Sequence, residues 1–139
     1  MTAPDPAPPA VPVNPPSSTG LSPTTASALA YAAGPVSGAI MLLAESTNPD
    51  VRFHAWQSIL AIGGLGVLVF LGYFAAVVSL FVSATAVALI VRLSMALWIV
   101  LLLVWAFCLW KALAGERVKL PLAGDWAERM LKATGPRIS

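Results

Sequence analysis

The chain has 139 residues, of which 58% are hydrophobic and only 10% are charged, and its formal net charge is +2. Soluble domains carry about a quarter charged residues, so this chain has too little charge to cover a water-facing surface, and we expect lipid to be its main solvent. The single cysteine excludes a disulfide scaffold, and the low net charge without a run of Lys and Arg argues against nucleic-acid binding.

The first 25 residues hold 8 of the 12 prolines and one charge, Asp5. Such a segment cannot bury enough apolar surface to offset the entropy lost on ordering. We therefore predict a disordered, proline-rich tail over residues 1–25.

Residues 26–44 carry no charge, and 19 helical residues at about 1.5 Å each approach the thickness of the hydrocarbon core. This stretch predicts the first membrane helix, with a kink or a local break at Gly34-Pro35. Small residues recur at every fourth position and predict close packing of helices, either inside the chain or in self-association. We call them the small-residue stripe: Ala26, Ala30, Gly34 and Gly38.

A long apolar region follows a polar connection. Asn48-Pro49-Asp50 is typical of a helix start, because Asn caps, Pro fits the first turn and Asp suits the positive end of the helix dipole. Residues 55–91 are uncharged, then comes Arg92, then 18 more uncharged residues. A crossing needs about 20 residues, so we predict two long helices, about 49–82 and 86–113, with the turn near 82–86.

Gly115 ends the third predicted helix. Asp125 and Glu128 have the spacing of a capping box, which predicts a short helix ending before Gly135. Trp126 and Met130 share a face of this helix, so it is expected to lie on the membrane surface, with a solvated helix as the alternative.

Together these features predict an all-α integral membrane protein with three transmembrane helices and a short interfacial C-terminal helix. The domain division is 1–25 tail, 26–114 transmembrane domain and 115–139 cytoplasmic tail. Residues 111–139 hold six Lys/Arg against three acids, so the positive-inside rule places the C-terminus in the cytoplasm. Three crossings then put the N-terminus outside the cell inner membrane.

Polar residues on the second predicted helix form one stripe, because Asp50, His54, Gln57 and Ser58 fall at offsets of 0, 4, 7 and 8. Asp50 and His54 are close enough for the carboxylate to orient and charge the imidazole. The stripe is either a proton-sensitive or substrate-contacting site, or a hydrogen-bonded cluster that fixes how the helix inserts, and we favour the cluster. Arg92 is expected to snorkel to the outer interface, with gating or anion contact as the alternative. No metal-ligand spacing or phosphate-binding loop occurs, so no cofactor and no enzymatic activity are expected.

Two segments carry a family resemblance: Asn48-Pro-Asp-Val-Arg-Phe-His-Ala-Trp-Gln-Ser58 and Gly115-Glu-Arg-Val-Lys-Leu-Pro-Leu-Ala-Gly-Asp125. They resemble a family of small prokaryotic membrane proteins of unknown function that is similar to the Tic-twenty-like component of chloroplast protein import. The resemblance covers about residues 26–129 and implies an all-helical protein of the prokaryotic cell membrane, without a settled reaction. The signature positions it implies are Arg52, Phe53, His54, Gln57, Ser58, Gly115, Lys119, Pro121, Gly124 and Asp125.

The functional expectation is a non-enzymatic membrane protein that contacts the lipid bilayer and assembles with other membrane proteins, or with itself through the small-residue stripe, with protein translocation as a candidate process. The alternative is a small oligomeric transporter or channel lined by His54, Gln57 and Ser58. A membrane serine hydrolase using Ser58 is a remote third hypothesis, because nothing resembles a nucleophile elbow.

Overall fold

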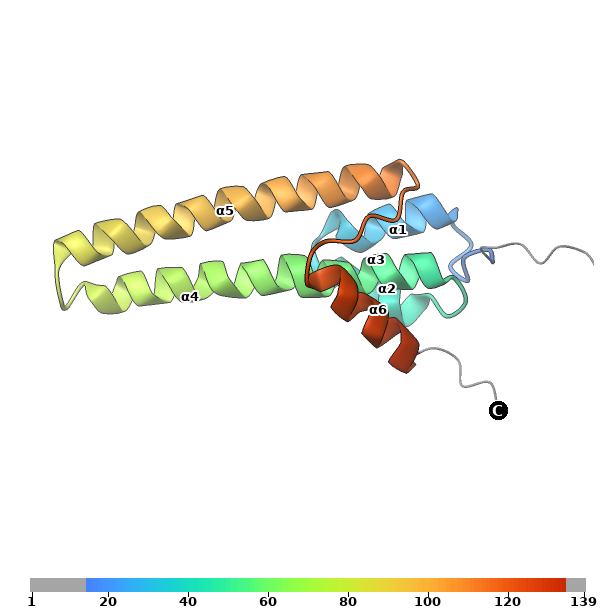
Figure 1. Cartoon of the computed structure of the whole chain (residues 1–139), viewed down its shortest axis with the longest axis horizontal. Helices are drawn as coiled ribbons and strands as arrows, with labels where there is room; N and C mark the ends of the chain where they lie inside the picture. The colour runs from blue at the N-terminus through green and yellow to red at the C-terminus, as the bar shows by residue number, and fades with distance from the viewer. Residues whose placement is uncertain (1–14, 135–139) are drawn as a thin grey trace, which may run out of the picture.

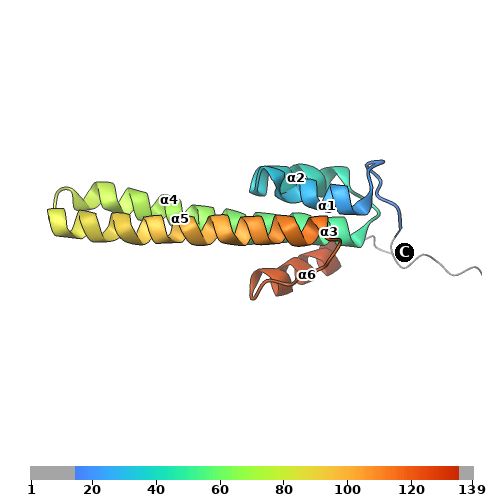
Figure 2. The same cartoon turned by 90° about the horizontal axis from the view of Figure 1, so that it is seen from above.

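The computed structural model describes residues 15–134, and every regular element within that range is a helix, as predicted (Figure 1). A long hairpin of α4 and α5 extends from a cluster of shorter helices, which we call the head and which contains α1, α2, α3 and α6. In the view of Figure 2, α1 and α2 lie on one face of the layer formed by the long helices, and α6 lies on the opposite face. The elements are α1 (Pro23–Ala32), α2 (Pro35–Ala44), α3 (Pro49–Gln57), the π-helix η1 (Ser58–Ile62), α4 (Gly63–Ser79), α5 (Ala84–Leu113) and α6 (Ala123–Thr134).

The predicted first membrane helix over 26–44 is wrong, because the chain reverses at Gly34. Gly34 has φ +60°, a conformation that only glycine adopts easily, and Pro35 then starts α2 with its fixed φ. The predicted break is present, but it separates two helices of 10 residues that pack side by side. Each is about 15 Å long, half of a crossing.

Two helices in the described residues are long and apolar enough to cross a membrane, in place of the three predicted. The first, Pro49–Ser79, joins α3, η1 and α4, and the second is α5. Asn48 caps the first as predicted, accepting hydrogen bonds from the Asp50 and Val51 amides at 3.0 and 3.2 Å. The turn at 80–83 begins two residues before the predicted one, and the Ser83 side chain caps α5.

Because the two long helices form one hairpin, α1 and α6 lie at the same end of the molecule, in the head (Figure 1). Hydrogen bonds tie Pro15 to Asn48 and Thr134 to Arg52 at this end. The predicted scheme placed the two ends of the chain on opposite sides of the membrane. That scheme depended on a third crossing over 26–44, which the structure replaces with the α1–α2 hairpin.

The described part of the predicted disordered tail is ordered, while residues 1–14 lie outside the described residues. Residues 15–22 pack on the connection between α2 and α3, where Asn48 donates a hydrogen bond to the Pro15 carbonyl at 2.6 Å. The Ser17 and Ser18 hydroxyls both donate to the Glu45 carboxylate. The tail prediction is therefore wrong for residues 15–25. The buried Glu45 carboxylate binds the Ser17 and Ser18 hydroxyls, and Pro23 starts α1 behind the Ser22 cap.

Glu45 is 1% exposed and has no cationic partner among the described residues. Burial raises the pKa of its carboxyl. Hydrogen bonds from Ser17 and from the backbone amides of Asn48, Thr47 and Ser18 outweigh burial and hold that pKa well below its usual range.

The segment after α5 folds back along α3. Gly115 has φ +73°, and the Glu116 amide donates to the Lys111 carbonyl at 3.0 Å, which closes the end of α5. The helix α6 starts two residues before the predicted capping box, because the chain turns at Leu122, with φ 67°. It packs against α3 with Ala127 fully buried, whereas Trp126 is 52% exposed.

Candidate functional site

The predicted polar stripe on α3 and η1 points into the head, towards α1, α5 and the segment after Gly115. His54, Gln57 and Ser58 are 5%, 1% and 0% exposed, so this part of the stripe is internal. Asp50 lies at its outer edge and is partly exposed. The helical period therefore identified a real cluster.

At the outer edge of the cluster, Arg117 pairs with Asp50. Its Nη1 lies 3.0 Å from Asp50 Oδ1, and its guanidinium lies 4.2 Å from the centroid of the Phe53 ring. The ion pair keeps about a quarter to a third of its side-chain surface exposed, so its contribution to stability is modest. The stacked ring holds the guanidinium in place.

His54 is bonded to a tyrosine and not to the carboxylate predicted for it. Its Nδ1 lies 3.3 Å from the Tyr31 hydroxyl, and the Tyr31 and Phe53 rings meet the imidazole edge-on. Asp50, which the spacing offered as the partner of His54, is engaged by Arg117 instead. Sequence reasoning missed Tyr31 and Arg117, because they come from α1 and from the segment after α5.

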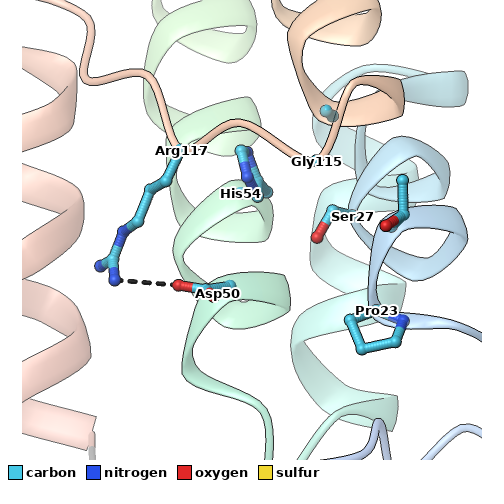
Figure 3. Close-up of a pocket in the computed structure, with 8 residues that line it drawn as sticks. Pro23, Ser27, Asp50, His54, Gly115 and Arg117 are labelled. Atoms are coloured by element: carbon cyan, nitrogen blue, oxygen red, sulfur yellow. Dashed lines mark hydrogen bonds and ion pairs between the residues drawn. The ribbon is translucent and has the colours of Figure 1, made fainter. Parts of the chain in front are cut away.

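A polar cavity of about 110 Å³ opens between α1, α3 and the end of α5 (Figure 3). It is large enough for a few water molecules or one small polar molecule. Carboxylate, guanidinium, imidazole and hydroxyl groups all reach its wall. The lining residues are Pro23, Thr24, Ser27, Asp50, His54, Ala112, Gly115 and Arg117.

Deeper in the head, Gln57 and Ser58 connect separate elements. Gln57 Nε2 donates to the Val118 carbonyl at 3.2 Å, while its Oε1 is buried without a hydrogen-bond partner among the described residues. The Ser58 hydroxyl donates to the Gly34 carbonyl at 2.9 Å, at the turn between α1 and α2. Ser58 is fully buried and its hydroxyl is bonded to backbone, so it is not arranged as a nucleophile.

The tail signature residues build the turn that brings α6 against α3. Lys119 forms an ion pair with Glu128 at 2.6 Å, and a Cβ atom on Gly124 would lie 2.9 Å from the Lys119 Cβ. Arg52 on α3 donates to the Thr134 carbonyl at 3.0 Å, at the end of α6.

Pro121 lies within the same turn, and its carbonyl accepts from the Ala123 amide at 2.8 Å. Asp125 is exposed in the first turn of α6. The two signature segments thus meet in the folded chain.

Arg92 is not part of this cluster. It is exposed on α5, 16 residues before Cys108, which is about 24 Å along the helix. Its neighbours Leu89 and Leu93 are also exposed, at 57% and 58%. Arg92 therefore lies on the outer surface of the hairpin.

The small-residue stripe is used inside the chain. Ala26 and Ala30 are 0% exposed, and a Cβ atom on Gly38 would lie 2.9 Å from the Ala55 carbonyl oxygen. Gly34 is buried too. The expectation that these residues pack inside the chain is confirmed.

Comparisons with known proteins place the chain in a family. No family model and no solved structure matches it. A UPF0132 membrane protein from Archaeoglobus fulgidus is 34% identical over 76% of this chain and 92% of its own length. A second from the same organism is 40% identical over 74% of this chain and 95% of its own length. One from Methanocaldococcus jannaschii is 33% identical over 81% of this chain and 91% of its own length. The predicted membership of a small membrane protein family of unknown function is confirmed, and the chain belongs to the UPF0132 family of membrane proteins.

Proposed function

We propose that this chain is a non-catalytic membrane protein that assembles with other membrane proteins through the free end of its α4–α5 hairpin. The observation that carries the proposal is the apolar hairpin end beyond Arg92. Leu80, Phe81 and Val82 in the turn are 65%, 91% and 77% exposed.

The charges on α5 bracket a bilayer. Lys111 lies 19 residues after Arg92, which is about 28 Å along the helix and close to the ~30 Å of the hydrocarbon core. With both cations at the headgroups, the hairpin continues for eight more residues from Arg92 back to Ala84, about 12 Å. A headgroup layer is about 5–7 Å deep on each side, so the apolar turn extends past it into water.

Other placements also leave a group that lacks a partner. If the turn lies at the lipid surface, Arg92 is about 12 Å inside the hydrocarbon, where a charge is costly unless it finds a partner or snorkels to the interface. A tilt that fits all 30 residues of α5, about 45 Å, into 30 Å would be roughly 48°, above the usual range of 0–40°. A second membrane protein would cover the apolar turn when the turn extends into water. It would supply a partner for Arg92 when the turn lies at the lipid surface.

The end of the molecule that carries the head is proposed to lie on the cytoplasmic side of the membrane. The head and the adjoining end of α5 carry the described Lys and Arg residues other than Arg92, which favours the cytoplasmic side. Since the described residues contain two long helices, residues 15–22 are proposed to lie on that same side. We propose protein translocation as the process to examine first, because the two signature segments resemble a family that is similar to the Tic-twenty-like component.

Photo-crosslinking tests the assembly. A benzoylphenylalanine replacing Phe81 is expected to crosslink to a protein in native membranes. The same residue replacing Phe70, which is 70% exposed in the middle of α4, should crosslink to lipid and serves as the matched control. If position 81 captures no protein, or no more than position 70 does, the proposal fails.

A second candidate, a path for protons or a small polar solute, is supported by the cavity beside His54. Of the three residues first assigned to such a path, only His54 lines the cavity, whereas Ser58 is closed off by Gly34. Proton flux into proteoliposomes, followed with a pH-sensitive dye, should fall in His54→Ala. Flux equal to that of empty liposomes, or unchanged in the variant, counts against this function.

A further inference from the structure

We propose that α1 and α2 form a re-entrant hairpin, which enters the leaflet on the head side, turns at Gly34 and returns, with the outer face of α2 on lipid acyl chains. This inference concerns how the head sits in the membrane, and it holds or fails independently of any assembly at the hairpin end.

The two flanks of the head differ in charge. Residues 23–44, which make up α1 and α2, contain no charged side chain, and they lie on one face of the long helices (Figure 2). The helix α6 covers the opposite face. It carries four charged side chains in 12 residues: Asp125, Glu128, Arg129 and Lys132. The two flanks are therefore suited to different surroundings, apolar for α1–α2 and aqueous for α6.

The sides of α2 are matched to two different environments. Its inner side carries Gly38 and Met41, both buried. Its outer side carries Val36, Ile40 and Leu43 at offsets of 0, 4 and 7, exposed by 64%, 60% and 88%. A stripe of large aliphatic side chains facing outwards is costly in water and favourable in lipid.

This outer face adjoins a surface that already belongs to the membrane. A Cβ atom on Gly63, the first residue of α4, would lie 3.3 Å from Pro35 at the start of α2. The exposed apolar side chains of α4 begin one turn later, with Val67 and Leu68 at 58% and 52%. The lipid that covers α4 therefore meets α2 without an intervening polar surface.

The turn between the two helices is built for a place without water. In lipid, backbone groups released by a helix break must find partners inside the protein. The Gly34 carbonyl accepts from the Gly38 amide at 3.1 Å, as the first bond of α2, and also from the Ser58 hydroxyl at 2.9 Å. The Gly34 amide donates to the Tyr31 carbonyl at 3.0 Å. The Ala33 amide donates to the Ser37 hydroxyl at 2.9 Å, and Pro35 has no amide hydrogen. A turn in water would need none of these bonds.

The dimensions fit one leaflet. Each helix has 10 residues, about 15 Å, which equals half of a hydrocarbon core of about 30 Å. The turn lies beside Ile62, because a Cβ atom placed on Gly34 would be 3.3 Å from the Ile62 Cγ2 atom. A hairpin of this length reaches the region of the bilayer midplane and no further.

Single-cysteine labelling in proteoliposomes tests the inference. In a Cys108→Ser background, Val36→Cys and Ile40→Cys on α2 are compared with Leu103→Cys on α5 as a lipid-facing reference. Arg129→Cys on α6 is the aqueous reference. In detergent all four should react fully with a maleimide, which confirms that each side chain is accessible in the folded chain.

In bilayers, positions 36 and 40 should match position 103. We expect protection from a membrane-impermeant maleimide by at least about tenfold relative to position 129. A fluorescent label introduced before reconstitution should be quenched by lipids with a nitroxide on the acyl chain. Reaction as fast as at position 129 would overturn the re-entrant hairpin, and so would protection without lipid quenching, which would indicate a protein covering α2.

Discussion

The packing of α2 against α3 depends on the absence of a side chain at Gly38, so Gly38→Ala is the most direct test of the head. The added Cβ atom would lie 2.9 Å from the Ala55 carbonyl oxygen, 3.1 Å from Ser58 Cβ and 3.2 Å from Ile59 Cγ1. The closest of these is backbone in the middle of a helix, which cannot rotate away. The two helices would have to separate, and overpacking of this kind costs about 1–3 kcal/mol.

Alanine also favours a helix over glycine, so a control must isolate the contact. Gly66→Ala is such a control, because Gly66 lies inside α4 with nothing within 4 Å of an added Cβ. Helix propensity alone should make Gly66→Ala more stable by up to about 1 kcal/mol. Gly38→Ala gains the same helix propensity but also introduces the steric clash. Its free energy of unfolding should therefore be about 1–3 kcal/mol lower than that of Gly66→Ala.

Unfolding in mild detergent with added denaturant, followed by far-UV circular dichroism, measures this difference. Tryptophan fluorescence of the same samples reports on the loss of tertiary packing. If Gly38→Ala is as stable as Gly66→Ala, the close contact between α2 and α3 does not exist in the folded chain, and the arrangement of the head is wrong.

Three further outcomes follow from single contacts. The pKa of Glu45 is lower in the folded state than its unfolded value of about 4.3, so its hydrogen bonds stabilise the fold above that pH and are lost as the pH falls further. The free energy of unfolding of the wild type should therefore decrease below about pH 4, and Glu45→Gln should remove that pH dependence. A double-mutant cycle of Asp50→Asn and Arg117→Gln should give a coupling of only about 0.2–1 kcal/mol that shrinks in high salt, and a larger, salt-independent value would contradict the partly exposed geometry. Gly115→Ala should cost about 1–2 kcal/mol in the same unfolding assay, because φ is +73°, and Gly115→Asn should cost less.

The long helices could be predicted because their signals are local. A cap at Asn48 and an uncharged run interrupted only by Arg92 are sufficient to define two helices and to place the turn within a few residues. The direction of the chain at Gly34 could not be predicted in this way. A 19-residue uncharged run has the same hydropathy whether it crosses the bilayer once or doubles back. Ser58, whose hydroxyl bonds to the Gly34 carbonyl at the reversal, is 24 residues further along the chain.

In the candidate site, too, the local features could be predicted from the sequence and the contacts between remote segments could not. Helical spacing brought Asp50, His54, Gln57 and Ser58 together, since neighbours on one face need no tertiary information. Their partners are remote: Tyr31 is 23 residues from His54, Val118 is 61 from Gln57, and Arg117 is 67 from Asp50. Nothing in the local pattern after Gly115 indicated that this segment would lie along α3.

The two sides of α2 explain why the small-residue stripe was informative about packing but not about topology. Small side chains at Gly34 and Gly38 let the hairpin approach α3 and η1, and this contact provides the Ser58 hydroxyl that satisfies the turn. Large side chains at Val36 and Ile40 on the other side then face outwards. A crossing helix in a bundle needs only the first of these properties, because its ends reach water. A hairpin that reverses within apolar surroundings needs both, because its turn must be satisfied by the protein while its outer surface is covered by lipid.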